Sequence, residues 1–432
     1  MQKYINVIGG GLAGCEAAYH IAQRGLKVRL IEMRPIKTTP VHKTNLLAEL
    51  VCSNSLKSEL EDTAQGLLKK EMRALGSLLL DCADKTRIPA GSALAVDREL
   101  FAETVTNRIM AHPLIEVVRE EACQIPSDAI TIIATGPLTS DTLTNEIQRL
   151  TGEEHLYFYD AVAPIVTLDS LDFNRVFKAS RYEKGTDDYY NCPMNQSEYE
   201  TFYHELINAD IKEGHSVDKN LFFNACMPVE VIARRGKDTL RYGPMRPVGL
   251  NPGKDKPKPY AVVQLRQEDI EGRFYSLVGF QTRIRWGEQD RIFRLIPGLK
   301  NAEFVRYGVM HRNTYINSPA VLLPSFQFKQ DKNIILAGQI TGVEGYMESA
   351  ATGIIAGINA VRIMRGQNPI ILSHNTMIGA LVNYITNANP ENFQPVNANF
   401  GLLPPLIPPV RDKRERYRAY SRRALEDLVD LN

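Results

Sequence analysis

The feature that most constrains the fold is a glycine-rich turn near the start of the chain, set between two apolar stretches. Residues 5–8 predict a buried strand, and the turn follows at once with the sequence Gly9-Gly10-Gly11-Leu12-Ala13-Gly14. Small and apolar residues then recur at helical spacing up to Gly25, and a second apolar stretch, 27–31, ends on Glu32. This order of strand, turn, helix, strand and acidic residue predicts the first βαβ unit of a Rossmann-like dinucleotide-binding domain.

Each glycine of the turn has a physical task in such a unit. Gly9 permits the tight turn, Gly11 lets a pyrophosphate approach the backbone, and Gly14 lets the helix pack closely on the strand. The helix N-terminus offers unpaired N–H groups and partial positive charge to the phosphates. Glu32 stands where a carboxylate accepts hydrogen bonds from ribose hydroxyls. We expect a dinucleotide site here, and the turn alone leaves FAD and NAD open.

The composition is that of an ordinary globular protein outside the membrane. The chain has 432 residues, 44% of them hydrophobic and 23% charged, with a formal net charge of +1. No apolar run approaches the ~18 residues of a membrane span, and the first predicted strand leaves no room for a signal peptide. The six cysteines are scattered without C-x-x-C spacing, so we expect neither a disulfide framework nor a metal site. We expect a cytoplasmic protein.

Two helices are predicted after the second apolar stretch, 27–31. One carries its apolar side chains on a single side, at Leu67, Leu68, Met72, Leu75, Leu78 and Leu79. The other begins after Asp97, a good N-cap residue, and runs to about His112. Ahead of both, Cys52 follows an apolar run and opens a turn rich in serine and asparagine, so we expect it at the end of an element.

The later pattern predicts a domain inserted into the first one. Residues 129–136 form an apolar strand ending in Ala-Thr-Gly, which resembles the later strand of FAD-binding flavoproteins and favours FAD. From about residue 160 the alternation of strand and helix is lost. The segments 261–265 and 275–280 then predict strands of a separate sheet.

Near residue 331 the first pattern returns, with a buried strand at 333–338, a glycine-rich turn and a small-residue helix from Ser349 to about Met364. We therefore expect an α/β fold in which a discontinuous, Rossmann-like FAD-binding domain holds a smaller α+β domain. The expected boundaries are 1–160 and 331–432 for the FAD-binding domain and 161–330 for the insertion.

Candidate chemistry lies in the predicted insertion and in the tail. Cys226 precedes an acid and the pair Arg234-Arg235, which would favour a reactive thiolate, although a single cysteine is more often buried and inert. His311 could stack on a planar ligand, or be structural. Basic residues crowd 234–258 and 411–423, where either a polyanion contact or a solvated helix face would explain them.

These features meet in a resemblance that covers nearly the whole chain. The sequence resembles the folate- and FAD-dependent tRNA (uracil-5-)-methyltransferase family. The segments that carry the resemblance are 7–14, 48–56, 163–166, 307–313, 337–346 and 399–403. The glycine turn is common to many flavoproteins, whereas the segments around Cys52, His311 and Gln339 to Tyr346 are specific to this family.

The resemblance implies an activity and a set of site residues. FAD would be held by the first turn and Glu32, together with Gly338, Gln339, Gly342, Gly345 and Tyr346. Cys52 and Cys226 would be the catalytic thiols, one adding to uracil C6 and the other acting as base or proton donor at C5. The carbon would come from 5,10-methylenetetrahydrofolate through the flavin, which NADPH or NADH reduces, and His311 would stack on the pterin.

The implied substrate is the T-arm of tRNA at uridine 54, with the basic segments on RNA phosphates. Two alternatives stay open: the same chemistry on a ribosomal RNA uridine, and a flavin-dependent RNA-binding protein without turnover. A larger flavoprotein that modifies the wobble uridine is disfavoured, because too few residues follow position 365 for its additional helical domain. Between the thiols, the arginines near Cys226 favour it as nucleophile.

Overall fold

The structure is a computed structural model that describes residues 4–39, 41–126, 128–152, 156–183, 186–211, 227–253 and 257–429. For 156–162, 309–312 and 429 it describes the backbone alone.

A five-stranded parallel sheet forms the centre of the first body. Its strands, in spatial order, are β16 (Ile334–Leu336), β7 (Thr131–Ile133), β1 (Ile5–Ile8), β2 (Val28–Glu32) and β6 (Ile115–Arg119). All four pairings are parallel. Parallel sheets are covered on both faces, which explains why β1 is a continuous apolar run with every residue buried. Because β16 comes from the last part of the chain, the domain is discontinuous, as predicted.

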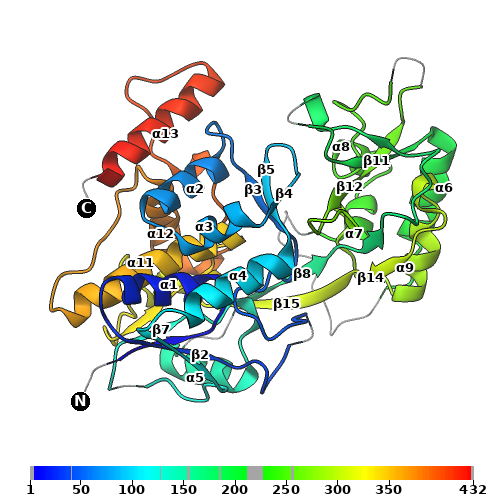
Figure 1. The fold of residues 1–432 in the computed structure, drawn as a ribbon. Coiled ribbons are helices and arrows are strands. Elements are labelled where there is room, and N and C mark those ends of the chain that lie inside the picture. The colour runs from blue at the N-terminus through cyan, green and yellow to red at the C-terminus, as the bar shows by residue number, and fades with distance from the viewer. Residues whose placement is uncertain are drawn as a thin grey trace.

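Helices pack around this sheet (Figure 1). They are α1 (Leu12–Gln23), α2 (Ala64–Ala74), α3 (Leu78–Lys85), α4 (Arg98–Met110), α5 (Asp141–Thr151), α10 (Ser318–Val321), α11 (Tyr346–Met364) and α12 (Met377–Asn387). The closest pair is α1 and α11. A Cβ atom at Gly353 would lie 2.2 Å from the Ala13 carbonyl oxygen, and one at Gly357 would lie 2.7 Å from that of Ala17. The small residues of α11 therefore allow two segments far apart in sequence to pack backbone to backbone.

The helix predicted through Leu67 and Leu79 is wrong, because two helices occupy this stretch. Gly76 follows α2 with a φ of +81°, and the Ser77 hydroxyl then accepts a hydrogen bond from the Leu80 N–H as the N-cap of α3. The helix predicted after Asp97 is confirmed as α4, where the Asp97 carboxylate accepts the N–H groups of Glu99 and Leu100.

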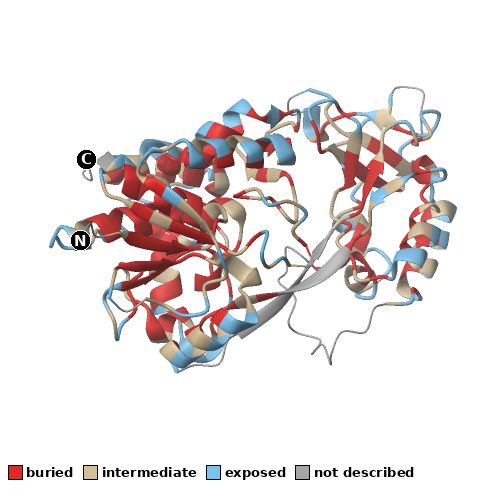
Figure 2. Cartoon of the chain, turned by 60° about the horizontal axis from the view of Figure 1, so that its bottom comes forward, coloured by how far each residue is buried: buried red, intermediate tan, exposed pale blue. Residues whose placement is uncertain are grey.

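The second body contains a six-stranded sheet with antiparallel pairings. In spatial order its strands are β10 (Phe177–Lys178), β11 (Tyr190–Met194), β12 (Ala261–Gln267), β13 (Phe274–Leu277), β9 (Ile165–Thr167) and β14 (Phe304–Arg306). Its helices are α6 (Gln196–Ile207), α7 (Val229–Ala233), α8 (Thr239–Tyr242) and α9 (Trp286–Phe293). Residues such as Phe202, Phe280 and Phe293 form its own core. Figure 2 shows the two bodies with buried residues concentrated in each.

An antiparallel pair of strands joins the two bodies. The chain leaves the first body along β8 (Leu156–Val162) and returns along β15 (Val309–Tyr315). Ile316 and Phe328 already belong to a core cluster shared with the parallel sheet, so the first body resumes before residue 331. The α/β class with a discontinuous Rossmann-like domain and an insertion is confirmed.

Two smaller features complete the first body. A three-stranded sheet of β3 (Ser55–Ser58), β5 (Ala93–Val96) and β4 (Arg87–Ile88) carries the loop that follows Cys52. The basic tail forms α13 (Lys413–Val429), which packs Tyr420 and Ala424 into the main core and leaves Arg418 and Arg422 exposed. No helix among the described residues is long and apolar enough to span a bilayer.

Candidate functional site

The N-terminal glycine turn combines tight packing with one open position. Gly9 has a φ of +105°, and a Cβ there would lie 2.5 Å from the Ala134 carbonyl oxygen. A Cβ at Gly14 would lie 1.8 Å from the Gly9 carbonyl oxygen. At Gly11, by contrast, a Cβ would meet no heavy atom within 4 Å. The fold itself requires Gly9 and Gly14, whereas Gly11 faces open space that a ligand can enter.

The first turn of α1 leaves backbone donors at this open position. Gly11 is the N-cap, and no side chain caps the helix, so the N–H groups of Leu12, Ala13 and Gly14 have no intrahelical acceptor. Together with the positive end of the helix dipole, they suit a phosphate. The residues present therefore fit the pyrophosphate of a dinucleotide.

Glu32 holds the turn in place from the end of β2. Its Oε2 accepts the Gly10 N–H at 2.8 Å, and its Oε1 accepts the Arg34 Nε at 2.8 Å. Although burial acts to raise the pKa of Glu32, the Arg34 guanidinium outweighs it and holds that pKa below its ordinary value. Glu32 and Gly11 also line one cavity of about 80 Å³. The carboxylate is thus anionic and reaches the space where a ribose would lie.

The second glycine turn joins β16 to α11. Gly338, Gly342 and Gly345 have φ values of +84°, +87° and +119°, which side chains rarely adopt. Within the turn, Gln339 donates a hydrogen bond from Nε2 to Glu344 Oε2 at 2.6 Å. Gly345 is the N-cap of α11, whose N-terminus also has no side-chain cap. The expected turn is present, and its helix starts at Tyr346, three residues before the predicted Ser349.

Tyr346 connects this turn to the Cys52 loop. Its hydroxyl oxygen accepts the backbone N–H of Cys52 at 2.8 Å and that of Ser53 at 3.0 Å. Burial, followed by the neighbouring Cys52, raises the pKa of the Tyr346 phenol, so the hydroxyl stays protonated. One residue of the second turn therefore fixes the position of one candidate thiol.

Three arginines surround the same loop. Arg98 and Arg306 donate to the carbonyl oxygens of Leu50 and Val51 at 3.4 and 3.0 Å, respectively. Arg266 donates to the Ser53 hydroxyl at 2.9 Å.

A buried carboxylate, Glu268, lies among these arginines, 2.7 Å from Arg98 and 3.5 Å from Arg266. Burial acts to raise the pKa of Glu268, but Arg98 and Arg266 outweigh it and lower that pKa. Burial acts to lower the pKa of Arg98, yet Glu268 raises it above its ordinary value, and Cys52 contributes in the same direction. The loop that carries Cys52 is therefore bound by three arginines, two of which pair with Glu268.

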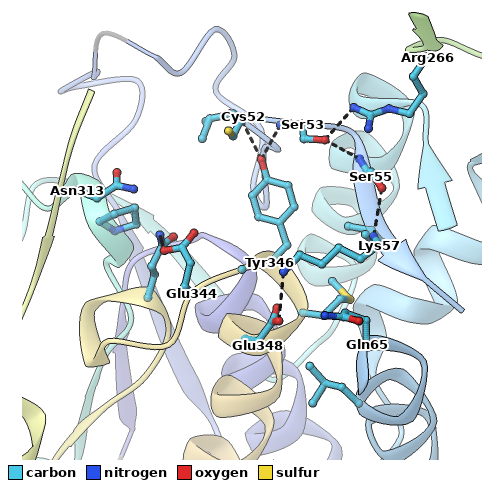
Figure 3. Close-up of a pocket in the computed structure, with 17 residues that line it drawn as sticks. Cys52, Ser53, Ser55, Lys57, Gln65, Arg266, Asn313, Glu344, Tyr346 and Glu348 are labelled. Atoms are coloured by element: carbon cyan, nitrogen blue, oxygen red, sulfur yellow. Dashed lines mark hydrogen bonds and ion pairs between the residues drawn. The ribbon is translucent and has the colours of Figure 1, made fainter. Parts of the chain in front are cut away.

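Part of this loop lines a cavity of about 280 Å³, whose wall comes mostly from the first body, with Arg266 from the second (Figure 3). Cys52, Arg266 and Tyr346 contribute to its wall. On the side of α11, the Lys57 ammonium lies 3.3 Å from Glu348 Oε1, and Glu348 is buried in the first turn of that helix. The cavity is therefore lined by the Cys52 thiol, by residues of the second glycine turn and by the Lys57 ammonium.

Two predicted site residues are not placed by this geometry. Cys226 lies outside the described residues. His311 lies on β15, where its backbone pairs with Asp160, and its side chain is outside what the structure describes. Among the described residues, no group of three or more metal-ligating side chains could hold a metal ion.

Comparison with known proteins assigns the family. Residues 4–368 match the model of the family described as glucose inhibited division protein A. A methylenetetrahydrofolate–tRNA-(uracil-5-)-methyltransferase TrmFO of Syntrophomonas wolfei is 66% identical over 432 residues, which cover 100% of this chain and 99% of the relative. A TrmFO of Bacillus pumilus is 54% identical over 100% of this chain and 99% of its own length. The chain belongs to the TrmFO family.

A solved structure supports the same fold for this TrmFO-family chain. Aquifex aeolicus GidA matches with a TM-score of 0.71 at 17% identity, over 100% of this chain and 74% of that one. At this identity the likeness shows the fold alone.

Several residues of the TrmFO-family cavity were not found from the sequence. They are the lining residues Lys57, Gln65, Arg266, Asn313 and Glu348, together with Arg98, Glu268 and Arg306, which do not line the cavity but contact the Cys52 loop or its arginines. Asn313 stands in a segment that carried the resemblance, which could have singled it out. The arginines had no such signal, because they come from α4, β12 and β14 and meet only in the folded chain.

Proposed function

We propose that this protein methylates C5 of uridine 54 in the T-arm of tRNA, with 5,10-methylenetetrahydrofolate as carbon donor and FAD, reduced by NADPH or NADH, as reductant. The observation that carries the proposal is the single cavity shared by Cys52 and Tyr346, a candidate thiol and the first residue of the second glycine turn. The names of the TrmFO relatives support the substrate and the carbon donor. We place the reaction in the cytoplasm, with the tRNA.

The two glycine turns would hold FAD. The N–H groups after Gly11 would bind the pyrophosphate, Glu32 the ribose, and the turn from Gly338 to Tyr346 the flavin end. When bound, FAD supplies reducing equivalents and carries the one-carbon unit to the uracil. The helix N-terminus at Gly345 favours negative charge at that end.

The two thiols would activate the uracil. Addition of one thiolate at C6 makes C5 nucleophilic, so that C5 can form the new carbon–carbon bond. The other thiolate removes the C5 proton, and the C6–sulfur bond then breaks to restore the ring. We propose Cys226 as nucleophile and Cys52 as base. Arg98 and Arg306 bind the carbonyl groups just before Cys52, and positive charge near a thiol favours the thiolate.

Other residues would bind the carbon donor and the RNA. We propose that His311 stacks on the pterin of the folate. The RNA phosphates would contact the basic segments 234–258 and 411–423, whose described exposed residues include Arg235, Arg414 and Arg418.

A methylation assay tests this function directly. The protein is supplied with FAD, NADPH, folate labelled in its methylene carbon, and tRNA transcripts with uridine or cytidine at position 54. Label is expected in 5-methyluridine of the uridine transcript alone, as mapped by mass spectrometry. Label in ribosomal RNA but not in tRNA would replace the substrate. Binding of RNA and flavin with no labelled product in any RNA would favour a binding protein without turnover.

A further inference from the structure

One amide in the wall of the cavity is buried with an unsatisfied acceptor. Asn313, on β15, is 1% exposed, and its Oδ1 has no hydrogen-bond partner among the described residues. A buried polar atom without a partner is costly, so native proteins rarely keep one without a use for it. Asn313 retains an acceptor that no described residue satisfies.

The position of this amide points to a ligand as the missing partner. Asn313 lines the same cavity as Cys52 and Tyr346, and Figure 3 shows it beside Glu344, on the far side of the cavity from Lys57. The nearby Gln339 amide donates to Glu344, and no hydrogen bond among the described residues joins it to the Asn313 oxygen. Asn313 therefore places a buried amide with an unpartnered acceptor in the wall of the space in which the reaction is proposed to occur.

The chemistry of the amide restricts what can bind. A carboxamide presents one acceptor oxygen beside an NH2 donor, and it can be turned so that either faces a given ligand atom. Its complement is a lactam edge, in which a ring N–H donor is adjacent to a C=O acceptor. We propose that Asn313 is a recognition residue that forms paired hydrogen bonds with the lactam edge of a heterocycle in this cavity.

This inference rests on the proposed function, which brings three such rings to the site. Uracil, the flavin and the pterin each carry N3–H next to C4=O. They share the chemistry that Asn313 recognises, and binding experiments can separate them. A site built to hydrogen-bond such a group loses affinity when either partner is removed, because the remaining group is left unpaired.

The test compares Asn313→Leu, which keeps the shape of the side chain but removes both polar groups, with Asn317→Leu. Asn317 also has an unpartnered Oδ1 but does not line this cavity, so it is a matched control. Each protein is titrated with FAD as apoprotein, and with tetrahydrofolate and a uridine-containing T-arm RNA after loading with FAD. Asn313→Leu is expected to weaken binding of one of these by roughly 10- to 100-fold, with Asn317→Leu unchanged.

Two further measurements identify the ligand and exclude a structural role. If FAD or RNA is the ligand, a form of it methylated at N3 should bind wild type more weakly than the unmethylated ligand does. The Asn313→Leu protein should bind the methylated and unmethylated forms equally well. The melting temperature of the Asn313→Leu apoprotein should equal or exceed that of wild type, since an unsatisfied acceptor is removed. Unchanged affinity of Asn313→Leu for all three ligands would overturn the inference, whether or not the apoprotein is less stable. Wild type that binds none of them would overturn the proposed function itself.

Discussion

Among single residues, Cys52 is positioned mainly by hydrogen bonds to its loop from residues that are distant in the sequence. Tyr346 accepts its backbone N–H, while Arg306 and Arg98 bind the two carbonyl groups before it. Arg266 then binds Ser53. These hydrogen bonds come from both bodies, so the thiol can be positioned only after the bodies have docked.

The Tyr346 hydroxyl gives the first prediction. In Tyr346→Phe the N–H groups of Cys52 and Ser53 lose their acceptor, so we expect the free energy of unfolding to fall by about 1–3 kcal/mol. We also expect the methylation rate to fall by more than FAD affinity, because the thiol loses its support. Thermal melts, FAD titration and single-turnover methylation measure these effects. Tyr384→Phe is the control, since that hydroxyl donates to Gln394 away from the cavity. Equal effects of the two variants would contradict the proposed support.

Gly11 and Gly14, in the same turn, should respond differently to substitution by valine. In Gly11→Val the new side chain enters open space, so we expect a folded protein that no longer binds FAD. In Gly14→Val the side chain would collide with the Gly9 carbonyl, and we expect a protein that does not fold. Circular dichroism reports the fold and flavin absorbance reports the cofactor. A folded Gly11→Val protein with a full flavin spectrum would show that the pyrophosphate does not lie there.

The site residues that could be predicted act within one βαβ unit or one turn. A Cβ at Gly14 would meet the Gly9 carbonyl, and Glu32 accepts the N–H of Gly10, which follows Gly9. Because these contacts lie within one βαβ unit, the spacing of the three residues in the sequence is enough to identify them. Arg98 and Glu268 form their ion pair across 170 positions, and no local pattern marks such a pair. Arg234 and Arg235 are close to Cys226 in the sequence, whereas folding brings a different set of arginines to Cys52.

At the scale of elements, the apolar periodicity of the sequence does not predict where one helix ends and the next begins. The leucines of α2 and α3 are buried together, so their periodicity resembles one helix, and the break comes from Gly76 and Ser77. The break also depends on a distant residue. The Glu16 carboxylate, in α1, accepts the N–H groups of Leu78 and Leu79 at 3.1 and 3.0 Å, which stabilises the new N-terminus.

A second buried carboxylate caps a helix in the same way and gives a pH prediction. Glu71, in α2, accepts the N–H groups of Met377 and Ile378 at the start of α12, and burial raises the pKa of Glu71 from 4.5 to about 8. Between these two values the folded state binds more protons than the unfolded state. The contribution of Glu71 is therefore fully present below about pH 4.5 and is lost as pH rises through about 8.

Glu71→Gln, which cannot titrate, should remove this dependence. The stability of wild type relative to Glu71→Gln is expected to fall by about 1–3 kcal/mol as pH rises from about 5 to about 8. Urea unfolding at several pH values measures the difference. Glu103→Gln, at an exposed position, is the control. A difference that does not change with pH would contradict the burial argument.

The basic tail is an element with two distinct faces. Tyr420, Ala424 and Leu428 are buried in the main core, whereas Arg418 and Arg422 are exposed. Exposed basic residues can therefore be neutralised without loss of packing. Changing the exposed positions to glutamine should weaken tRNA binding and reduce its salt dependence by roughly 0.7–0.9 in log–log slope for each phosphate that the tail no longer neutralises. The set to change is Arg411, Lys413, Arg414, Arg418 and Arg422.

Filter binding at several salt concentrations measures this effect, and FAD binding should be unaffected. Arg149→Gln, an exposed residue of α5, is the control. An unchanged salt slope for the tail variant would leave the tail as a solvated helix face.

At the scale of the whole molecule, the two bodies meet at the loop that carries Cys52. The Asn54 side chain donates to the Gln267 carbonyl at 2.8 Å and accepts from Arg266 at 2.7 Å, and the Asp97 carboxylate accepts the Ile270 N–H at 3.1 Å. The first body thus provides one proposed thiol, and the second body carries the segment leading to α7, next to which Cys226 occurs in the sequence. The proposed sharing of the active site would explain why a nucleotide-binding fold and a basic insertion occur in one chain.

The final prediction concerns both thiols. Cys52→Ala and Cys226→Ala should each bind FAD and oxidise NADPH nearly as wild type does, because neither thiol is needed to hold or reduce the flavin. Each should abolish methylation. Without the nucleophile, C5 is not activated, and without the base the C5 proton remains. Cys123→Ala, at an exposed position, is the control and should stay active.

A T-arm RNA with 5-fluorouridine at position 54 separates the two roles. It has no C5 proton to remove, so the adduct should remain covalently attached to the nucleophilic cysteine, and peptide mapping would locate it. We expect the adduct on Cys226, absent from Cys226→Ala and retained in Cys52→Ala. An adduct on Cys52 would exchange the two roles and leave the shared site intact. An adduct on Cys15, Cys82 or Cys192, all buried in the structure, would contradict the site itself, because no uracil could reach such a thiol without local unfolding.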